Sequence, residues 1–319
     1  MIKVNKYARI MVSYLFLGVI DMKYEKFTAR DGKEINLAVW EDVAEPKGLV
    51  QIIHGMCEHV ARYDEFAEYL NSKGYIVVGD DHRGHGLTDK DNLGIALDGD
   101  LFKDTLRDEL DLTDYLINKY SLPVYVFGHS YGSFITQNYL MCSSDKIAGA
   151  ILCGSALMSK PIASFGYRVA RKKCKKQKNN EGTFFADVTF NSYDKKLKEG
   201  KNAWLSYNKQ NVEAFNNDEL CGFTCSYGFY RDFFKGLVGI AKGKWEISNK
   251  NLPILIIAGA DDPVGGSGKL VKKLYKRYKK NGNKATLMLV SNGRHEILNE
   301  YNKAETFAFI HNFITNCDL

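Results

Sequence analysis

Proline is scarce in this sequence, which contains five prolines and 28 glycines in 319 residues. So little proline excludes a long proline-rich linker. The composition also excludes a largely disordered chain, because 45% of the residues are hydrophobic and only 26% are charged. A chain of this length and composition folds as one large α/β domain or as two smaller ones.

Cysteines with a disulfide-type spacing are also lacking. The seven cysteines are an odd number, and no two of them form a Cys-x-x-Cys pair. We therefore expect reduced thiols and a cytoplasmic location. Cys57 lies in a loop near the predicted site described below, and a reactive role for it stays open.

The N-terminal apolar stretch is short. It runs from Ile10 to Ile20, which is eleven residues, whereas about 20 are needed to span a bilayer. Basic residues precede it, as at the front of a signal peptide, but no small-x-small cleavage pattern follows. We expect residues 1–21 to be an extension or leader, with Met22 as an alternative start. A membrane-associated or secreted protein is the alternative to a cytoplasmic one.

The net charge of +6 is mild and comes mainly from two segments, Arg168 to Lys178 and Lys269 to Lys280. In the second, Leu270, Leu274 and Tyr278 recur every fourth residue, which predicts an amphipathic helix packed on the core. No recognised nucleic-acid module accompanies either segment, so we expect no nucleic-acid partner. The first segment is suited to transient contact with a membrane surface. Nothing in the sequence indicates the oligomeric state.

Strand-like and helix-like segments alternate along most of the chain, which is typical of a mostly parallel sheet covered by helices. Residues 24–29 and 34–40 are predicted to form an antiparallel hairpin. The further strands are predicted in GLVQII, YIVVGD, PVYVFG, AGAILCG, LPILIIAG and ATLMLV. Helices are predicted over residues 62–72, 101–120, 134–141, 269–280 and 301–314.

The alternation stops between residues 155 and 251, where the sequence is rich in aromatic and basic residues. We expect this segment to be a helical lid inserted after the sixth strand, since long insertions of this kind are commonly functional. The two flanking parts, 22–154 and 252–319, are then the core of the protein.

One strand ends in Gly128-His129-Ser130-Tyr131-Gly132 and continues with helical spacing. Ser130 either caps that helix or is a nucleophile at a sharp turn. A serine hydroxyl needs a base and an orienting acid to attack a carbonyl. Asp261 and Asp262 follow one later strand, and His295 follows the next. The order Ser, Asp, His is the order expected in an α/β-hydrolase arrangement.

Such a nucleophile also needs N–H donors for the oxyanion that develops on the carbonyl. One donor is expected from Tyr131, the residue after the serine, and the other from Met56, in the loop after the third strand. Tyr131 is a bulky residue beside the nucleophile, and its phenol is expected to narrow the pocket.

Other polar residues in these loops have a structural interpretation. We expect Glu58, Arg62 and Asp81 to form a polar network that braces the loops. Histidines concentrate in the same loops, where they suggest a metal site or, as we favour, hydrogen bonds to loop backbone; they are His54, His59, His82 and His85.

Together, HGMCEHVARYDEF, DDHRGHG, GHSYGS, CGFT, ADDPVG and GRHEILNE resemble the monoacylglycerol lipase and lysophospholipase branch of the α/β-hydrolase superfamily, of serine aminopeptidase S33 type. The resemblance runs from about Met22 to the C-terminus and is loose only in the lid. It implies an α/β-hydrolase fold with an eight-stranded sheet and hydrolysis of a carboxylic ester without metal or cofactor. It also implies Ser130 as nucleophile, Asp262 rather than Asp261 as acid, His295 as base, and the N–H groups of Met56 and Tyr131 as oxyanion hole.

The substrate is expected to be a small acyl ester such as a monoacylglycerol or lysophospholipid, because the aromatic lid residues suit an apolar acyl chain. A short-chain or aromatic acyl esterase is the alternative. Two less favoured alternatives are an amidase or aminopeptidase on the same fold, and a non-catalytic binding protein. The sequence does not indicate which lid residues touch the substrate.

Overall fold

The computed structural model describes residues 22–97, 99–243 and 245–317, so the predicted leader at residues 1–21 lies outside the described residues. In the described chain, eight strands form one sheet in the order β1-β2-β4-β3-β5-β6-β7-β8. The strands are β1 (Lys23–Thr28), β2 (Glu34–Trp40), β3 (Gly48–Ile53), β4 (Tyr75–Asp80), β5 (Val124–His129), β6 (Gly149–Cys153), β7 (Ile254–Gly259) and β8 (Ala285–Val290). β1 and β2 form the predicted antiparallel hairpin, β2 also pairs antiparallel with β4, and all further pairs are parallel. This confirms the predicted α/β-hydrolase sheet.

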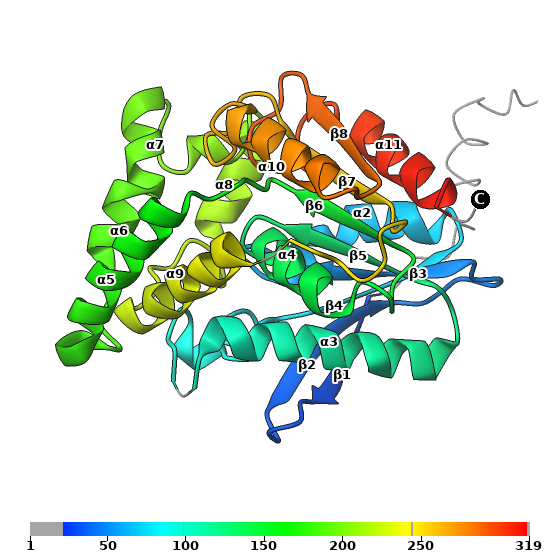
Figure 1. Ribbon diagram of the computed structural model, residues 1–319, viewed down its shortest axis with the longest axis horizontal. Helices are drawn as coiled ribbons and strands as arrows, with labels where there is room; N and C mark the ends of the chain where they lie inside the picture. Colours follow the sequence, from blue (N-terminus) through cyan, green and yellow to red (C-terminus); the bar gives the residue numbers. More distant parts are fainter. Residues whose placement is uncertain (1–21, 98, 244, 318–319) are drawn as a thin grey trace, which may run out of the picture.

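Helices cover both faces of this sheet (Figure 1). The helices outside the segment between β6 and β7 are η1 (Val60–Tyr63), α2 (Asp64–Asn71), η2 (Lys90–Asn92), α3 (Leu101–Tyr120), α4 (Tyr131–Ser143), α10 (Lys269–Lys280) and α11 (Lys303–Thr315). α3, α4 and α10 share one buried cluster with one side of the strands, and α2 and α11 share another with the opposite side. β5 is buried along its whole length, as expected for a parallel strand covered on both faces.

The helices predicted at 101–120 and 269–280 have the predicted bounds, and the apolar stripe of α10 is buried at Val271, Leu274 and Tyr278. The helix predicted over residues 62–72 differs at its start. There a 3-10 turn, η1, precedes α2, which begins at Asp64 with acidic residues in its first turn.

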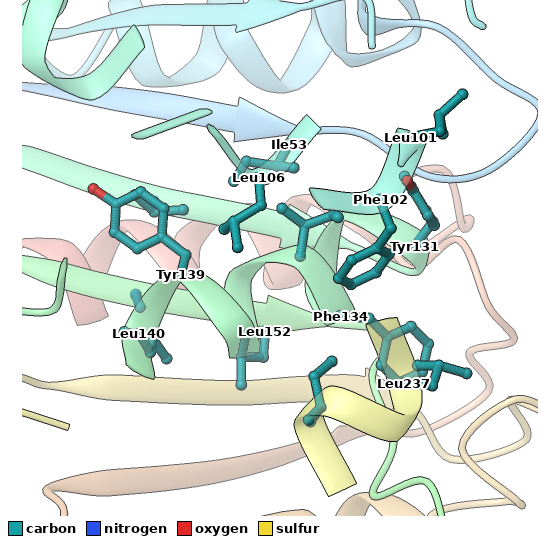
Figure 2. Close-up of a cluster of buried hydrophobic side chains, with 14 of the residues drawn as sticks. Ile53, Leu101, Phe102, Leu106, Tyr131, Phe134, Tyr139, Leu140, Leu152 and Leu237 are labelled. Atoms are coloured by element: carbon teal, nitrogen blue, oxygen red, sulfur yellow. The ribbon is translucent and has the colours of Figure 1, made fainter. Parts of the chain in front are cut away.

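Between β6 and β7 the chain forms α5 (Lys160–Gln177), α6 (Thr183–Val188), α7 (Phe190–Leu197), η3 (Ala203–Leu205), α8 (Lys209–Asn217) and α9 (Tyr227–Lys242). We call residues 154–253 the insertion. Its helices gather at one end of the molecule (Figure 1). Leu237 of α9 reaches the buried cluster formed by Ile53, Phe102 and Phe134, so the insertion packs on the core (Figure 2). None of the described helices is long and apolar enough to cross a membrane.

Candidate active site

Ser130 stands at a sharp turn between β5 and α4, with φ 50° and ψ −113°. A non-glycine residue at positive φ costs on the order of 1–3 kcal/mol and persists only where the surrounding structure enforces it. Here the main chain does so, because Ser130 N donates to Cys153 O and Ser130 O accepts from Ser133 N, both at 2.9 Å. The Ser130 side chain makes no capping hydrogen bond to α4, so the simple capping interpretation of this serine is wrong.

The two glycines around Ser130 are there because nothing larger fits. A Cβ atom at Gly128 would lie 2.1 Å from Thr136 Oγ1, and one at Gly132 would lie 1.9 Å from the carbonyl oxygen of Ile53. Both contacts are far below van der Waals distance. The glycines therefore let α4 start directly against β3 and β5, which fixes the position of Ser130.

The predicted acid and base follow β7 and β8, and the structure brings them together. Asp262 Oδ1 lies 3.0 Å from His295 Nδ1, and the two residues are 0% and 2% exposed. Asp262 Oδ1 also accepts from Val264 N at 2.8 Å. Asp261 points elsewhere: it is exposed, and its Oδ2 accepts from Tyr207 OH at 3.1 Å.

His295 is held on several sides. Its ring packs against Trp204 of the insertion and His129, with centroid distances of 5.0 and 4.9 Å. A Cβ atom at Gly154 would lie 3.1 Å from His295 Cε1. Ser130 and His295 line the same cavity, but Ser130 Oγ makes no hydrogen bond to His295 in the described structure. Such contacts are often long in a free enzyme and tighten when substrate binds.

The two predicted oxyanion donors both border a cavity that Ser130 lines. Met56 lines the same cavities as Ser130, and Tyr131 is the first residue of α4. Among the described residues, neither Met56 N nor Tyr131 N donates a hydrogen bond. The Tyr131 ring is buried against Phe102 and Phe229. It forms only part of the wall of the apolar cavity described next.

Two cavities meet at Ser130 and Met56. The first has a volume of about 450 Å³ and a mainly apolar wall, which includes Phe134, Phe165, Phe184, Phe185, Val188, Tyr230, Phe233, Phe234, Leu237 and Leu270. The second has a volume of about 250 Å³ and more polar groups, which include Glu58, Asn191, Lys201, Asn202, Thr224, His295 and Glu296. Most of the apolar wall comes from α5, α6 and α9 of the insertion. We call these the apolar and the polar cavity.

Residues 44–302 match the model of a protein family described as serine aminopeptidase, S33. The chain belongs to this family. Mouse monoglyceride lipase is 26% identical over 234 residues, which are 73% of this chain and 71% of that protein. A thermostable carboxyl esterase from Bacillus coagulans has a TM-score of 0.83 at 27% identity, covering 93% of this chain and all of that one.

A yeast monoglyceride lipase, solved as a soluble variant with a substrate analogue, has a TM-score of 0.72 at 19% identity over 95% of this chain and 97% of that one, which supports the fold alone. With these relatives, the protein is a carboxylic ester hydrolase of the monoglyceride lipase-like type.

In this hydrolase the loop after β3 is braced by Glu58, as predicted. Its Oε1 accepts from Gly55 N at 2.6 Å and Tyr63 OH at 2.9 Å, and lies 3.1 Å from His129 Nδ1. Arg62 donates to Glu58 at 2.6 Å and also holds Glu296 at 2.7 Å. Burial alone would raise the pKa of Glu58, but His129 and Arg62 outweigh it and hold the pKa well below its usual range.

The third predicted bracing residue, Asp81, fixes the neighbouring loop. Its carboxylate accepts from Val60 N at 3.0 Å, Leu87 N at 2.8 Å and Asn36 Nδ2 at 3.1 Å. A Cβ atom at Gly86 would lie 2.2 Å from this carboxyl group, so the Asp81 side chain fills the turn. Asp81 has a structural role, as the sequence predicts.

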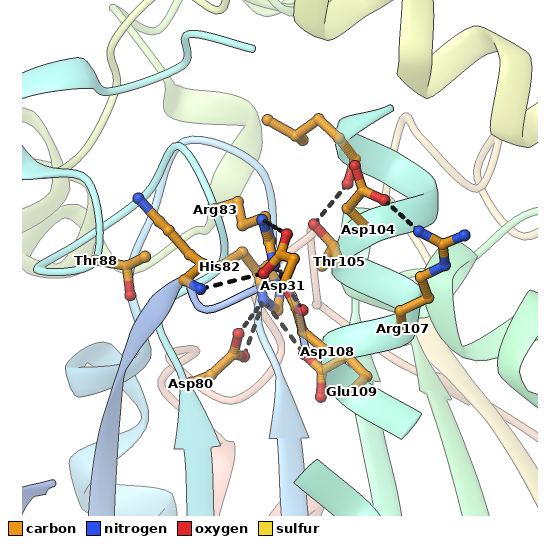
Figure 3. A network of polar contacts seen from close by, with 12 residues as sticks. Asp31, Asp80, His82, Arg83, Thr88, Asp104, Thr105, Arg107, Asp108 and Glu109 are labelled. Carbon is orange, nitrogen blue, oxygen red and sulfur yellow. Dashed lines mark hydrogen bonds and ion pairs between the residues drawn. The ribbon is translucent and has the colours of Figure 1, made fainter. Parts of the chain in front are cut away.

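The histidines of these loops mostly bond loop backbone, also as predicted. His54 Nδ1 lies 2.8 Å from Gly55 O, His54 Nε2 accepts from His82 N at 3.1 Å, and His85 Nδ1 lies 3.1 Å from Arg83 O. Two ring nitrogens face carboxylates instead. His59 Nε2 pairs with Asp218, and His82 Nδ1 lies 2.9 Å from Asp80 and 3.3 Å from Glu109 (Figure 3).

These carboxylates outweigh the effect of burial and raise the pKa of His82 well above its usual value. In the described residues, two groups bring metal-type ligand atoms together, namely Asp80, His82 and Glu109, and His59, Asp218 and Cys221. In each group a histidine is already paired with a carboxylate, since His59 Nε2 lies 2.8 Å from Asp218.

Two residues of the site were missed by the sequence analysis. Glu296 is buried beside His295 and completes the Arg62 network, and Trp204 covers the His295 ring from the insertion. Glu296 directly follows the predicted base in GRHEI, which was a usable signal. Trp204 lies in a segment without periodicity, so no pattern pointed to it.

Proposed function

We propose that this hydrolase cleaves long-chain monoacylglycerols through an acyl-enzyme on Ser130. The observation that carries the proposal is the position of Ser130 at the junction of an apolar and a polar cavity, beside the buried Asp262–His295 pair. A monoacylglycerol has the same division, with a long apolar acyl chain and a small polar alcohol joined by one ester.

In this mechanism His295 removes the proton of Ser130 as the hydroxyl oxygen attacks the ester carbonyl. The oxyanion is stabilised by the N–H groups of Met56 and Tyr131, each contributing on the order of 3 kcal/mol. His295 then protonates the leaving glycerol oxygen. A water molecule then attacks the acyl-enzyme in the same way, with His295 as base, and the fatty acid is released from Ser130. Asp262 holds the imidazole in the tautomer with hydrogen on Nδ1 and stabilises the imidazolium.

The apolar cavity is the proposed acyl site. Its volume of about 450 Å³ is in the range of small-molecule sites, and aromatic rings and aliphatic side chains dominate its wall. We propose that the insertion acts as a lid, with the boundaries predicted at 155–251, because it supplies most of this wall. Ile162, Phe165, Phe184 and Val188 are exposed at the cavity, on the same part of the insertion as the basic residues of α5. Such a face is suited to transient contact with a lipid surface.

The polar cavity is the proposed site of the alcohol. Lysophospholipids are a second candidate substrate, because Lys201 lies at this cavity and offers a cation to a phosphate. An aminopeptidase would need a free carboxylate for the substrate ammonium. The two acidic residues of this cavity, Glu58 and Glu296, are both paired with Arg62, which argues against that alternative.

The proposal is tested with a fluorophosphonate probe and a panel of esters. Wild type should be labelled and Ser130→Ala should not be. Ser143→Ala, which changes the last residue of α4, should be labelled like wild type. The panel runs from p-nitrophenyl acetate to long-chain monoacylglycerols and lysophospholipids. Fastest turnover on two- to four-carbon esters, with none on the lipids, would contradict the substrate assignment while leaving the mechanism in place.

A further inference from the structure

Two free cysteines meet where the insertion contacts the loop after β3. Cys57 Sγ and Cys225 Sγ lie 3.4 Å apart, although the residues are 168 positions apart in the sequence. Cys57 follows Met56, the proposed oxyanion donor, and Cys225 lies two residues before the start of α9. The pair thus joins the proposed catalytic loop to the insertion.

The backbone holds the two sulfur atoms opposite each other. Gly222 N donates to Cys57 O at 2.9 Å, so the segment that carries Cys225 is bonded directly to the Cys57 loop. On its other side, Cys225 O accepts from Gly182 N at 2.8 Å. A disulfide bond needs a sulfur separation of about 2.05 Å, so the two sulfur atoms must approach each other by roughly 1.4 Å.

One member of the pair borders the substrate cavity. Cys57 lines the polar cavity together with Ser130, whereas Cys225 is completely buried behind it. A small polar oxidant that enters the substrate cavity therefore meets Cys57 first, with Cys225 in contact to react second.

We propose that Cys57 and Cys225 are an oxidation site at which hydrogen peroxide forms a disulfide that links the insertion to the loop after β3. The Cys57 thiolate attacks one peroxide oxygen, the O–O bond breaks, and a sulfenic acid and hydroxide form. The Cys225 thiolate then attacks the sulfenic sulfur, and the S–O bond breaks with loss of a second hydroxide. The two thiol protons convert the hydroxides to water. Each sulfur loses one electron, and peroxide gains two.

Disulfide formation should inhibit the enzyme, an effect that rests on the proposed function of Met56. Cys57 has a φ of 59°, a constrained conformation, so we expect movement of its side chain to shift the Met56–Cys57 peptide and, through the Met56 main chain, the Met56 N–H group. Losing one oxyanion donor lowers turnover about 10²–10³-fold in comparable enzymes, so a misplaced donor should lower it at least about tenfold. Burial, together with the neighbouring Cys57, raises the pKa of Cys225, so the reaction should be faster at alkaline pH.

The test treats the full chain with hydrogen peroxide at pH 8.5, blocks remaining thiols with iodoacetamide, and maps unreduced peptides by mass spectrometry. We expect a Cys57–Cys225 peptide that lacks two hydrogens and disappears with dithiothreitol, and hydrolysis of p-nitrophenyl butyrate that falls at least about tenfold and then recovers. Cys142→Ser removes an exposed thiol and should change neither result.

Cys225→Ala should keep the untreated activity within about twofold and resist inactivation, and Cys225→Ser repeats the test if the alanine variant folds poorly. Absence of the linked peptide in treated wild type, or equal inactivation of both Cys225 variants, would overturn the inference. If the untreated chain hydrolyses no ester, the proposed function fails, while the linked peptide still decides this inference on mass alone.

Discussion

Asp262 Oδ1 lies 3.0 Å from His295 Nδ1, with both side chains buried, whereas the neighbouring Asp261 faces solvent and Tyr207. Two adjacent carboxylates after one strand thus have different environments. Only Asp262 is placed to orient the imidazole of His295 and to stabilise its positive charge during proton transfer.

Asp262→Asn should lower kcat by about 10⁴-fold, because the amide stabilises the wrong imidazole tautomer while the shape of the site is retained. The measurement is steady-state hydrolysis of p-nitrophenyl butyrate, with circular dichroism to check the fold. Asp261→Asn is the matched control and should stay within a few-fold of wild type. A large loss in that control with little effect of Asp262→Asn would reverse the assignment of the acid.

Gly132→Ala should destabilise the protein, because the added methyl group would lie 1.9 Å from the carbonyl oxygen of Ile53. Backbone atoms cannot rotate away as a side chain does, so we expect a cost of about 3 kcal/mol, at the upper end for overpacking. The measurement is the free energy of unfolding in urea.

Gly239→Ala is the control for that substitution. Gly239 lies in α9, and a Cβ atom there would meet nothing within 4 Å. Replacing glycine by alanine inside a helix is favourable by about 0.5–1 kcal/mol, so this variant should be slightly more stable than wild type. If both variants have the same stability, the lack of space for a side chain at position 132 is not the reason for the glycine there.

Much of the fold was predictable because local pattern and tertiary environment agree. β7 is apolar along its whole length and β5 is apolar up to His129, both strands are fully buried, and the apolar stripe of α10 is the stripe that packs on the core. The order of Ser130, Asp262 and His295 was predictable for a related reason. The carboxyl ends of neighbouring parallel strands meet at one edge, so residues that follow those strands come together.

The insertion was not predictable in detail, because its contacts join residues with no shared pattern. Phe190 stacks on Trp204 at 5.3 Å between ring centroids, and the same tryptophan covers His295. The contact between Glu109 and His82 could not be predicted for a similar reason. Glu109 lies on α3 in a helical pattern with many acidic residues, and only the tertiary structure turns it toward His82.

His85 should make the protein less stable in acid. Burial, and to a lesser degree the charge of His82, lower the pKa of His85 to about 3. The unfolded chain binds this proton below the ordinary pKa of about 6.5, so stability is lost as the pH falls from about 6.5 toward 3, by up to about 1.4 kcal/mol per pH unit. The measurement is the free energy of unfolding in urea at pH 7, 6, 5 and 4.

The comparison variant is His85→Phe, which keeps the ring contacts with Phe223 and Phe229 and removes the titrating group. Its stability should fall less steeply with acidification than that of wild type, whatever its absolute value at pH 7. His311→Gln is a weaker case, since His311 is only partly buried, and should change the slope less. Identical slopes in wild type and His85→Phe would refute this explanation of acid sensitivity.

The two basic helices should differ in their effect on lipid hydrolysis. The exposed lysines of α5 share a helix with Ile162 and Phe165, which line the apolar cavity, whereas no lysine of α10 lines either cavity at Ser130. A basic residue near an anionic membrane contributes about 1 kcal/mol to binding. Reversing Lys172 and Lys175 to Glu should therefore lower hydrolysis of monoacylglycerol in phosphatidylserine-containing vesicles at least about tenfold and leave soluble esters unaffected.

The matched control for that pair reverses Lys272 and Lys276 of α10, which are also exposed and change the net charge by the same amount. If contact through α5 brings the hydrolase to its substrate, only the α5 pair should lose vesicle activity, and the salt dependence of the wild-type rate should weaken with it. An equal loss in both pairs would mean that total charge matters rather than a defined face. No loss in either would mean that substrate reaches Ser130 without electrostatic contact between α5 and the membrane.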